Sequence, residues 1–246
     1  MPPRIVVCVP TYLEVENVEP LLRGIRAALP DADVLLADDS SPDGTAGVAR
    51  RIAAELGRIE VVTNDRKVGL GEAYRRAFRV VFERDYDVIC QIDADLSHDP
   101  AVLPSLVAAV EDGCSLAIGS RYVPGGSITE WPWYRRALSR YGNRYAAAVL
   151  GIKIADATSA YRAFAADALK AIDVFTTRAT GYGFQIECAY RAHQLGLPVR
   201  EVPIVFADRQ RGRSKLGPAV AVEELTLVTW WGVRDRMRRL RHRALR

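Results

Sequence analysis

Hydrophobic and polar positions alternate in blocks along the first 120 residues. Short apolar runs predict buried β-strands, and the longer amphipathic stretches between them predict helices. The predicted strands are Ile5–Val9, Val34–Ala37, Ile59–Val62, Val88–Ile92 and Leu116–Ile118, and the predicted helices are Val18–Leu29, Thr45–Leu56, Gly71–Phe82 and Ala101–Glu111. This alternation indicates βαβ units and a mostly parallel sheet. We therefore predict an α/β fold with a single Rossmann-like domain, whose ligands bind beyond the C-terminal ends of the strands.

The second half of the chain is less regular. Its patterns predict a helix over Trp133–Leu150, a strand over Tyr161–Ala165, a helix over Gly183–Leu195 and a strand over Val199–Phe206. The polar and basic segment Ala207–Leu216 contains Gly212, is followed by Gly217, and is typical of a mobile loop. We expect residues 1–217 to form the globular domain and residues 218–246 to form an amphipathic C-terminal helix with a basic tail.

Composition allows a sizeable core and places the excess charge at one end. Apolar residues make up 49% of the 246 residues, so disorder is not expected. The formal charge is +4, and Arg234–Arg246 alone holds seven arginines against one aspartate. Such a tail suits nucleic acid, anionic lipid or an acidic partner, and composition does not choose among them.

Neither the cysteines nor the N-terminus indicates a secreted protein. The cysteines form no CxxC pair, so we expect buried thiols in a reducing compartment at Cys8, Cys90, Cys114 and Cys188. The N-terminus lacks the apolar region of a signal peptide. No segment reaches the ~18 apolar residues that a spanning helix needs. We expect a cytoplasmic protein that is soluble or peripheral to a membrane.

Acidic side chains follow three of the predicted strands, at Glu14, at Asp38 and Asp39, and at Asp93 and Asp95. Asp93 and Asp95 lie on one side of an extended segment, and two like charges so close are costly unless a cation neutralises them. Hard oxygen ligands suit Mg²⁺ or Mn²⁺, which also bind oxygens of a diphosphate. The pair therefore predicts a metal–diphosphate site. Asp43, before Gly44 and Thr45, is better explained as a turn or helix cap.

Nine motifs occur along the chain in one order: VPTYLEVEN, DDSSPDGT, GLGEAY, DADLSHDP, GSRYVPGG, a WP…R…SR.GN run, DATSAYRAF, GYGFQIE and P…DR…GRSK. Together they make the chain resemble the polyprenyl-phosphate mannose synthases, also called dolichol-phosphate mannosyltransferases, of glycosyltransferase family 2. The resemblance covers about residues 4–217. The motifs of the second half separate this group from other members of family 2. The resemblance implies a GT-A fold.

The resemblance implies roles for residues on the donor side of the site. The residues that match the family's nucleotide pocket are Pro10, Tyr12, Glu14 and Asp39. Asp93 and Asp95 match its metal and diphosphate site, with Asp95 among the catalytic residues. Ser97 stands where the family often has a glutamine that touches the metal, and serine is a weaker ligand. Mg²⁺ or Mn²⁺ is therefore the implied cofactor.

The resemblance also implies how the acceptor phosphate and the donor diphosphate are bound. Arg121 and Arg135 match the basic residues that receive the acceptor phosphate, and a guanidinium suits this task because it stays charged and binds two oxygens. Ser139 adds a hydrogen bond in the same run. Arg209 and Lys215 match loop residues that close over the donor diphosphate.

Two positions depart from the family's pattern. Ala160 stands where the family usually has glycine, and ~1 kcal/mol of strain is expected there if the backbone has positive φ. Leu13 replaces a common asparagine, and we expect a small effect because the backbone does much of the binding at that position.

These features lead us to expect an inverting transferase that moves mannose from GDP-mannose to a polyprenyl (dolichyl-type) monophosphate. It would lie at the cytoplasmic face of a membrane, contacting the surface through Trp133–Leu150 and the tail with Trp230 and Trp231. Whether a separate membrane subunit is also a partner is left open by the sequence. The alternatives are the same chemistry with UDP-glucose or another nucleotide sugar, a hydroxyl acceptor, and a binding module without activity. We expect no nucleic acid partner, because no recognition motif accompanies the basic tail.

Overall fold

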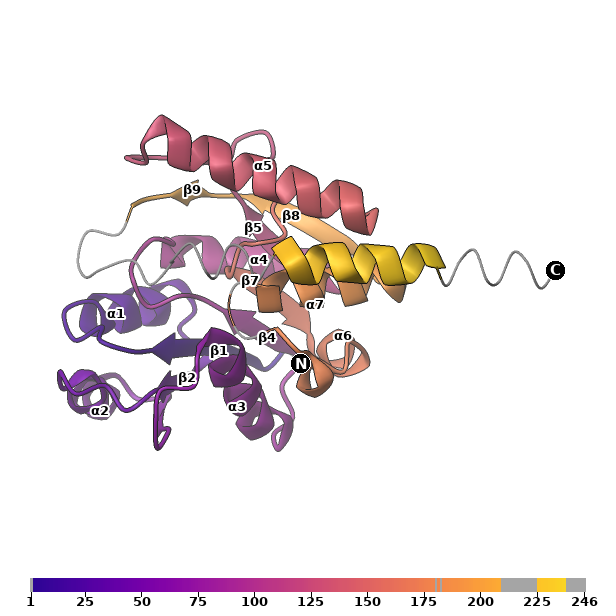
Figure 1. The fold of residues 1–246 in the computed structure, drawn as a ribbon. Coiled ribbons are helices and arrows are strands. Elements are labelled where there is room, and N and C mark those ends of the chain that lie inside the picture. The colour runs from indigo at the N-terminus through magenta and orange to yellow at the C-terminus, as the bar shows by residue number, and fades with distance from the viewer. Residues whose placement is uncertain (1, 180, 182, 209–224, 238–246) are drawn as a thin grey trace.

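The centre of the computed structural model is a sheet of seven strands in the order β3-β2-β1-β4-β7-β5-β8, with helices on both faces (Figure 1). The structure describes residues 2–179, 181, 183–208 and 225–237. The strands are β1 (Ile5–Thr11), β2 (Asp33–Asp38), β3 (Ile59–Thr63), β4 (Val88–Gln91), β5 (Leu116–Ser120), β7 (Arg162–Ala165) and β8 (Val199–Pro203). All neighbours run parallel except β7, which is antiparallel to both β4 and β5. The predicted mostly parallel sheet is confirmed.

The helices form one layer on each face of the sheet. One layer consists of α1 (Val18–Ala28), α2 (Thr45–Leu56) and α4 (Leu103–Glu111), which a 3₁₀ turn at Pro100–Val102 precedes. The other consists of α3 (Leu70–Phe82), α5 (Trp133–Leu150), α6 (Ala166–Ala171) and α7 (Gly183–Gln194). Alternate side chains of β1 enter the two cores, because successive residues of a strand point to opposite faces.

One predicted strand is wrong as a single element, whereas the boundaries of the other predicted strands and helices up to Leu195 lie within two residues of the observed ones. The run Val199–Phe206 contains two strands, β8 and β9 (Val205–Phe206), and β9 pairs with β6 (Ser127–Ile128) in a separate sheet. The chain changes sheet at Ile204, whose N–H donates to Ser120 O (3.0 Å) and whose carbonyl accepts from Ser127 N (2.9 Å). Both halves are extended and largely apolar, so periodicity alone does not reveal the change.

The four cysteines are buried and unpaired, as predicted. Removal from water disfavours the thiolate, and burial raises the pKa of Cys90 and of Cys188 to about 12. These thiols therefore remain protonated at neutral pH and act as small apolar side chains in the core.

Residues 225–237 form a helix that packs against α5 and α7 (Figure 1). Val228 and Trp231 are buried in the core, and the Trp231 ring stacks on Tyr190 of α7 with 6.2 Å between ring centroids. Tyr145 of α5 shares a hydrogen bond of 2.7 Å with Thr229. The opposite side of this helix exposes Trp230, Val233 and Met237. Across the described residues, no helix has the length and apolarity needed to cross a bilayer.

The close approach of this helix to α5 gives a test of its docking. A Cβ added at Gly232 would lie 2.5 Å from Val149 Cγ1 and 2.7 Å from Val149 O. We expect Gly232→Ala to lower the free energy of unfolding by about 1–3 kcal/mol, because an extra methyl must force the two helices apart. The measurement is urea unfolding of the purified protein.

Gly142→Ala in α5 is the matched control, since nothing lies within 4 Å of a Cβ at that position. It should leave the free energy of unfolding unchanged or raise it by up to about 1 kcal/mol, because alanine is the better helix former. Equal stability of Gly232→Ala and the wild type would show that the helix does not dock in this way.

Candidate functional site

Segments that follow β1, β2 and β4 meet at the edge of the sheet where an open α/β fold binds ligands. Three non-glycine residues there adopt the left-handed region: Leu13 (φ 58°), Ser40 (φ 54°) and Leu96 (φ 61°). Such conformations cluster at functional sites, because the surrounding structure must hold them in place. Pro10, predicted in the nucleotide pocket, is the second-last residue of β1 and belongs to this edge.

Hydrogen bonds join the loop after β1 to the loop after β2. The N–H of Glu14 donates to Thr45 Oγ1 (3.0 Å), and Glu14 Oε2 accepts from Asn17 Nδ2 (2.7 Å), so this predicted nucleotide-binding carboxylate is buried near the start of α1. Asp43 Oδ1 accepts from the N–H (3.1 Å) and from the hydroxyl (2.6 Å) of Thr45, the first residue of α2. The interpretation of Asp43 as a turn residue at a helix start is confirmed.

Asp39 and Tyr12, both predicted in the nucleotide pocket, contact the segment after β3. Asp39 is buried, and its carboxylate accepts from Asn64 Nδ2 (2.6 Å) and from the N–H of Val68 (3.1 Å). The ammonium of Lys67 lies 4.4 Å from the centroid of the Tyr12 ring, a cation–π contact. The two side chains therefore hold residues 64–68 beside the ends of β1 and β2.

Asp93 and Asp95 follow β4 as predicted. The buried Asp95 accepts the N–H of Ser97 on Oδ1 (3.1 Å), and Ser97 is buried as well. Asp93 Oδ1 lies 3.4 Å from the hydroxyl of Tyr74 in α3. Burial, and then the Asp93 charge, raise the pKa of Tyr74 well above its usual value. The hydroxyl therefore stays protonated and can donate to Asp93.

The donor set of Asp93 and Asp95 fits a divalent cation that is shared with a substrate. Within the part of the chain that the structure describes, no three His, Cys, Asp or Glu side chains gather into a complete metal site. One or two carboxylates are what Mg²⁺ usually takes from a protein, with phosphate oxygens and water completing its shell. The pair could therefore hold Mg²⁺ or Mn²⁺ together with a diphosphate, and Ser97 stays a further predicted ligand.

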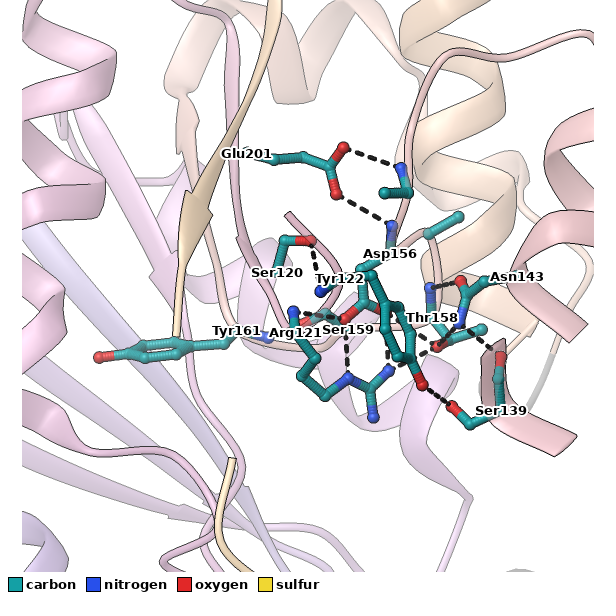
Figure 2. Close-up of polar contacts among 12 residues, drawn as sticks. Ser120, Arg121, Tyr122, Ser139, Asn143, Asp156, Thr158, Ser159, Tyr161 and Glu201 are labelled. Atoms are coloured by element: carbon teal, nitrogen blue, oxygen red, sulfur yellow. Dashed lines mark hydrogen bonds and ion pairs between the residues drawn. The ribbon is translucent and has the colours of Figure 1, made fainter. Parts of the chain in front are cut away.

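Arg121 follows β5 and forms a buried ion pair with Asp156 (Figure 2). Its Nε and Nη2 donate to the two carboxylate oxygens at 2.7 Å each, and its backbone N–H donates to Asp156 Oδ2 at 3.0 Å. The side chains are only 8% and 0% exposed. Burial raises the pKa of Asp156, but the charge and the hydrogen bonds of Arg121 outweigh it, so the pKa lies below its usual value. The pair thus stays charged and fixes the guanidinium.

The loop that carries Asp156 is held from three sides. Glu201 of β8 accepts the N–H groups of residues 155 and 156 (2.8 and 2.9 Å). The fully buried Arg162 of β7 donates to the carbonyls of residues 157 and 159, each at 2.7 Å. Asn143 of α5 accepts the N–H of residue 158 at 3.2 Å. The position of Asp156, and with it that of Arg121, is therefore fixed by two strands and a helix.

Ser139 of α5, predicted to donate to the acceptor, lies near Arg121 through one intervening side chain. The hydroxyl of Tyr122 donates to Ser139 Oγ at 2.6 Å (Figure 2). The guanidinium carbon of Arg121 lies 5.3 Å from the centroid of the Tyr122 ring. The structure thus brings Ser139 and Arg121 into contact with one aromatic side chain.

Arg135, the second predicted phosphate-binding arginine, contacts Trp131 and Asp208. Its guanidinium carbon lies 4.0 Å from the centroid of the indole ring, and its Nη1 donates to Asp208 Oδ1 at 3.1 Å. The same carboxylate oxygen accepts the indole N–H of Trp131 at 3.0 Å. Arg121 also contacts this indole, with its guanidinium carbon 5.8 Å from a ring centroid of Trp131. Both arginines therefore lie beside one buried aromatic side chain.

Residues 206–208 join the acidic part of the site to the arginines. The N–H of Ala207 donates to the carbonyl of Ser97 at 3.2 Å. The Phe206 ring lies 5.1 Å from the His98 ring and 5.2 Å from the Trp131 ring, and 5.2 Å separate it from the guanidinium carbon of Arg121. The carboxylate pair and the two arginines consequently occupy one edge of the sheet.

Three residues of the site were not predicted from the sequence, namely Trp131, Asp156 and Asp208. Each lies inside a motif that identified the family, in WP…R, DATSAYRAF and P…DR respectively. The motifs therefore carried a signal for these residues, but their partners become evident only from the contacts described above.

The remaining predicted residues fall outside the described part of the chain or differ in conformation from expectation. Arg209, Lys215 and most of the predicted loop Ala207–Leu216 lie outside the described residues, as does most of the basic tail. Ala160 is not among the residues with positive φ, so its methyl group carries no such strain. The left-handed conformation is instead at Leu13, a position where asparagine would adopt it more easily.

Comparisons with known proteins agree with this architecture. A family model described as "Glycosyl transferase family 2" matches residues 6–173. The chain is 43% identical to an undecaprenyl-phosphate mannosyltransferase of Micrococcus luteus, over 98% of both chains. It is 42% identical to a polyprenol monophosphomannose synthase of Mycolicibacterium smegmatis, over 97% of this chain and 90% of the relative.

Among solved structures, glucosyl-3-phosphoglycerate synthase of Mycobacterium tuberculosis, in complex with Mn²⁺, UDP-glucose and phosphoglyceric acid, is similar with a TM-score of 0.68. The match covers 93% of this chain and 80% of that chain at 20% sequence identity. A likeness at this level of identity concerns the fold.

The buried ion pair predicts a large loss of stability when one partner is removed. Asp156→Ala leaves Arg121 buried without its carboxylate, and we expect the free energy of unfolding to fall by about 3–5 kcal/mol. The measurement is urea unfolding at neutral pH. Because the pKa of folded Asp156 lies below its usual 3.8, the stabilisation is present above pH 3.8 and is lost as the pH falls through the folded value. The difference between wild type and variant should therefore narrow in acid.

Asp167→Ala is the matched control, because the side chain of Asp167 is 100% exposed and its contact with Lys170 is long, at 3.8 Å. Its unfolding curve should coincide with that of the wild type. If Asp156→Ala were as mild as this surface change, the ion pair would not fix Arg121.

Proposed function

The chain belongs to glycosyl transferase family 2 and has the GT-A fold predicted from its sequence, and we propose that it transfers mannose from GDP-mannose to a polyprenyl phosphate. One observation carries the proposal: a carboxylate pair and two arginines converge on residues 206–208 at the ligand-binding edge of the sheet. The two relatives at 43% and 42% identity, both named for mannosyl transfer to a polyprenyl phosphate, support it.

The donor binds at the ends of β1, β2 and β4. Pro10, Tyr12, Glu14 and Asp39 bind the nucleoside, for which the carboxylates supply hydrogen-bond acceptors and the Tyr12 ring supplies a flat apolar surface. Asp93 and Asp95 hold Mg²⁺ or Mn²⁺, with Ser97 as a weaker ligand. When bound, the cation neutralises charge on the diphosphate and on the GDP that leaves. Arg209 and Lys215 add positive charge to the same diphosphate.

Arg121 and Arg135 orient the acceptor, and Ser139 supplies a further hydrogen bond. A phosphate oxygen of the acceptor attacks the anomeric carbon as the bond to the GDP oxygen breaks, and GDP keeps the electron pair. Attack from the opposite face inverts the anomeric carbon and gives a β-linked mannosyl phosphate. The reaction does not require a general base from these residues, since a phosphate monoester with a second pKa of about 6 is largely ionised at neutral pH. Their contribution is positioning and charge stabilisation.

The acceptor lies in a bilayer, and α5 provides the surface that contacts it. One side of α5 exposes Tyr134, Leu138, Tyr141 and Tyr145, spaced as one helical face. The helix contains four arginines and no acidic residue, so it suits an anionic membrane. Arg135 belongs to the same helix and brings the phosphate site to the level of the lipid headgroups. The exposed side of residues 225–237 extends this surface, either to lipid or to a separate membrane subunit, at the cytoplasmic face.

The activity is tested with purified protein, polyprenyl phosphate in detergent, Mg²⁺ or Mn²⁺ and radiolabelled GDP-mannose. We expect label in the organic-extractable lipid, and at least about a 100-fold lower rate for Asp95→Ala, because electrostatic stabilisation of this kind is worth several kcal/mol. Arg135→Ala should raise the KM for polyprenyl phosphate while the KM for GDP-mannose stays constant.

UDP-glucose is the donor control in the same assay. Labelled lipid from UDP-glucose alone would keep the reaction and replace the sugar. Transfer to a soluble hydroxyl acceptor, or absence of any lipid product from protein with verified GDP binding, would refute the lipid-phosphate acceptor.

Membrane contact is tested by flotation with vesicles of phosphatidylglycerol and phosphatidylcholine. Leu138, 71% exposed in the middle of the α5 face, is replaced in Leu138→Glu. We expect about tenfold weaker binding or more, because the change removes apolar burial and adds a repelled charge. Leu195→Glu, at a 53% exposed leucine beyond the end of α7, is the control and should bind like the wild type. Equal loss in both variants would argue against α5 as the contact surface.

A further inference from the structure

Two positively charged arginines lie at the proposed acceptor site, and the side chains around them determine their positions. Arg121 and Arg135 come from different elements, the end of β5 and the start of α5. Like charges in proximity are unfavourable unless counter-charges or polarisable groups offset the repulsion. Within the described part of the chain, Arg121 pairs with Asp156 and Arg135 pairs with Asp208, and both arginines lie beside the indole of Trp131.

The two carboxylates differ in how tightly they hold their arginines. The Arg121–Asp156 pair is buried and bidentate, with side chains 8% and 0% exposed. The Arg135–Asp208 pair has one contact of 3.1 Å, and its side chains are 34% and 32% exposed. A half-exposed single contact fixes a long side chain only weakly. Arg135 therefore needs a second constraint, and the indole ring 4.0 Å from its guanidinium carbon provides one.

Trp131 is held more firmly than the arginine that rests on it. Its side chain is buried, its ring packs edge-on against Phe206 at 5.2 Å, and its N–H donates to Asp208 at 3.0 Å. Phe206 also lies 5.2 Å from the guanidinium carbon of Arg121. The ring pair thus forms one rigid surface that contacts both arginines.

We propose that Trp131 is a positioning residue for the acceptor: its ring, and its hydrogen bond to Asp208, set Arg121 and Arg135 at the spacing that binds a single phosphate group. The inference rests on the proposed function, in which these arginines bind the acceptor. A phosphate monoester has two or nearly two negative charges at neutral pH and offers oxygens to both guanidinium groups at once. The gain in binding free energy comes from pre-organisation, because an arginine already in place loses less conformational freedom when the phosphate binds.

The test measures binding by calorimetry, independently of transfer, on the full-length protein. The probes are citronellyl phosphate, a water-soluble short-chain analogue of the acceptor, and GDP with Mg²⁺, which reports the donor site. We expect Trp131→Leu to weaken citronellyl phosphate about tenfold, the size of one or two lost cation–π contacts, and to leave the Kd of GDP unchanged within about twofold. Trp131→Phe keeps a ring and should recover most of the affinity.

Two further variants keep the test decisive should the leucine variant fold poorly. Asp208→Ala removes the carboxylate that contacts both Arg135 and the Trp131 N–H, keeps the indole ring, and should weaken the binding of citronellyl phosphate in the same direction. In an Arg135→Ala background, Trp131→Leu should weaken binding less than it does alone, because the contact of the indole with Arg135 is already lost and only its more distant contact with Arg121 remains. Additive effects, an unchanged Kd in Trp131→Leu, or equal weakening of GDP and citronellyl phosphate would overturn the proposal.

Failure of the proposed function would look different. A wild-type protein that binds citronellyl phosphate in a Trp131-dependent way but transfers no mannose from GDP-mannose would refute the transfer reaction and leave the positioning role intact. If Trp131→Leu weakened the binding of GDP but not that of citronellyl phosphate, the Trp131 surface would belong to the donor diphosphate site. That result would refute its role in the acceptor site.

Discussion

A carboxylate with no exposed surface must be paired, and the pairing of Asp156 with Arg121 organises the second half of the site. The ion pair is stable only in one geometry, so the loop that carries Asp156 is fixed by Glu201, Arg162 and Asn143. This places β8, β7 and α5 in one hydrogen-bonded network behind a single guanidinium group (Figure 2). The contacts that offset the desolvation cost of the two charges therefore also fix the position of Arg121.

The two sides of the site are built in different ways. On the proposed donor side, the candidate residues lie in short segments directly after β1, β2 and β4, where left-handed residues such as Leu13 and Leu96 turn the chain. On the proposed acceptor side, the groups come from the end of β5, from α5 and from residues 206–208, and the last of these lie there because the chain leaves the central sheet at Ile204. Arg121 is held rigidly and Arg135 more loosely, so in the proposed function an incoming phosphate would meet one fixed and one adaptable partner.

Helix α5 takes part in both of the proposed binding events, contact with a membrane surface and binding of the acceptor phosphate. Its buried residues pack on the core, its exposed aromatic face points to solvent, and Arg135 near its start lies at the site. The helix of residues 225–237 packs beside it, with Val228 and Trp231 in the core and Trp230 exposed. The apolar residues of this C-terminal pattern thus lie on two opposite sides of one helix, one buried in the core and one exposed.

Local patterns in the sequence determined most of the secondary structure and the acidic half of the site. Thr45–Leu56 and Trp133–Leu150 were predicted at their observed bounds, because a buried face repeats with the period of its element. Asp93 and Asp95 follow β4 and are only two residues apart, so no contact between distant parts of the chain is needed to bring them together. Only the tertiary structure decided the partners of the two predicted arginines, since Arg121 lies 35 residues from Asp156 and Arg135 lies 73 from Asp208. Such contacts depend on which strands become neighbours, here on the antiparallel β7 between β4 and β5, and no local periodicity encodes that choice.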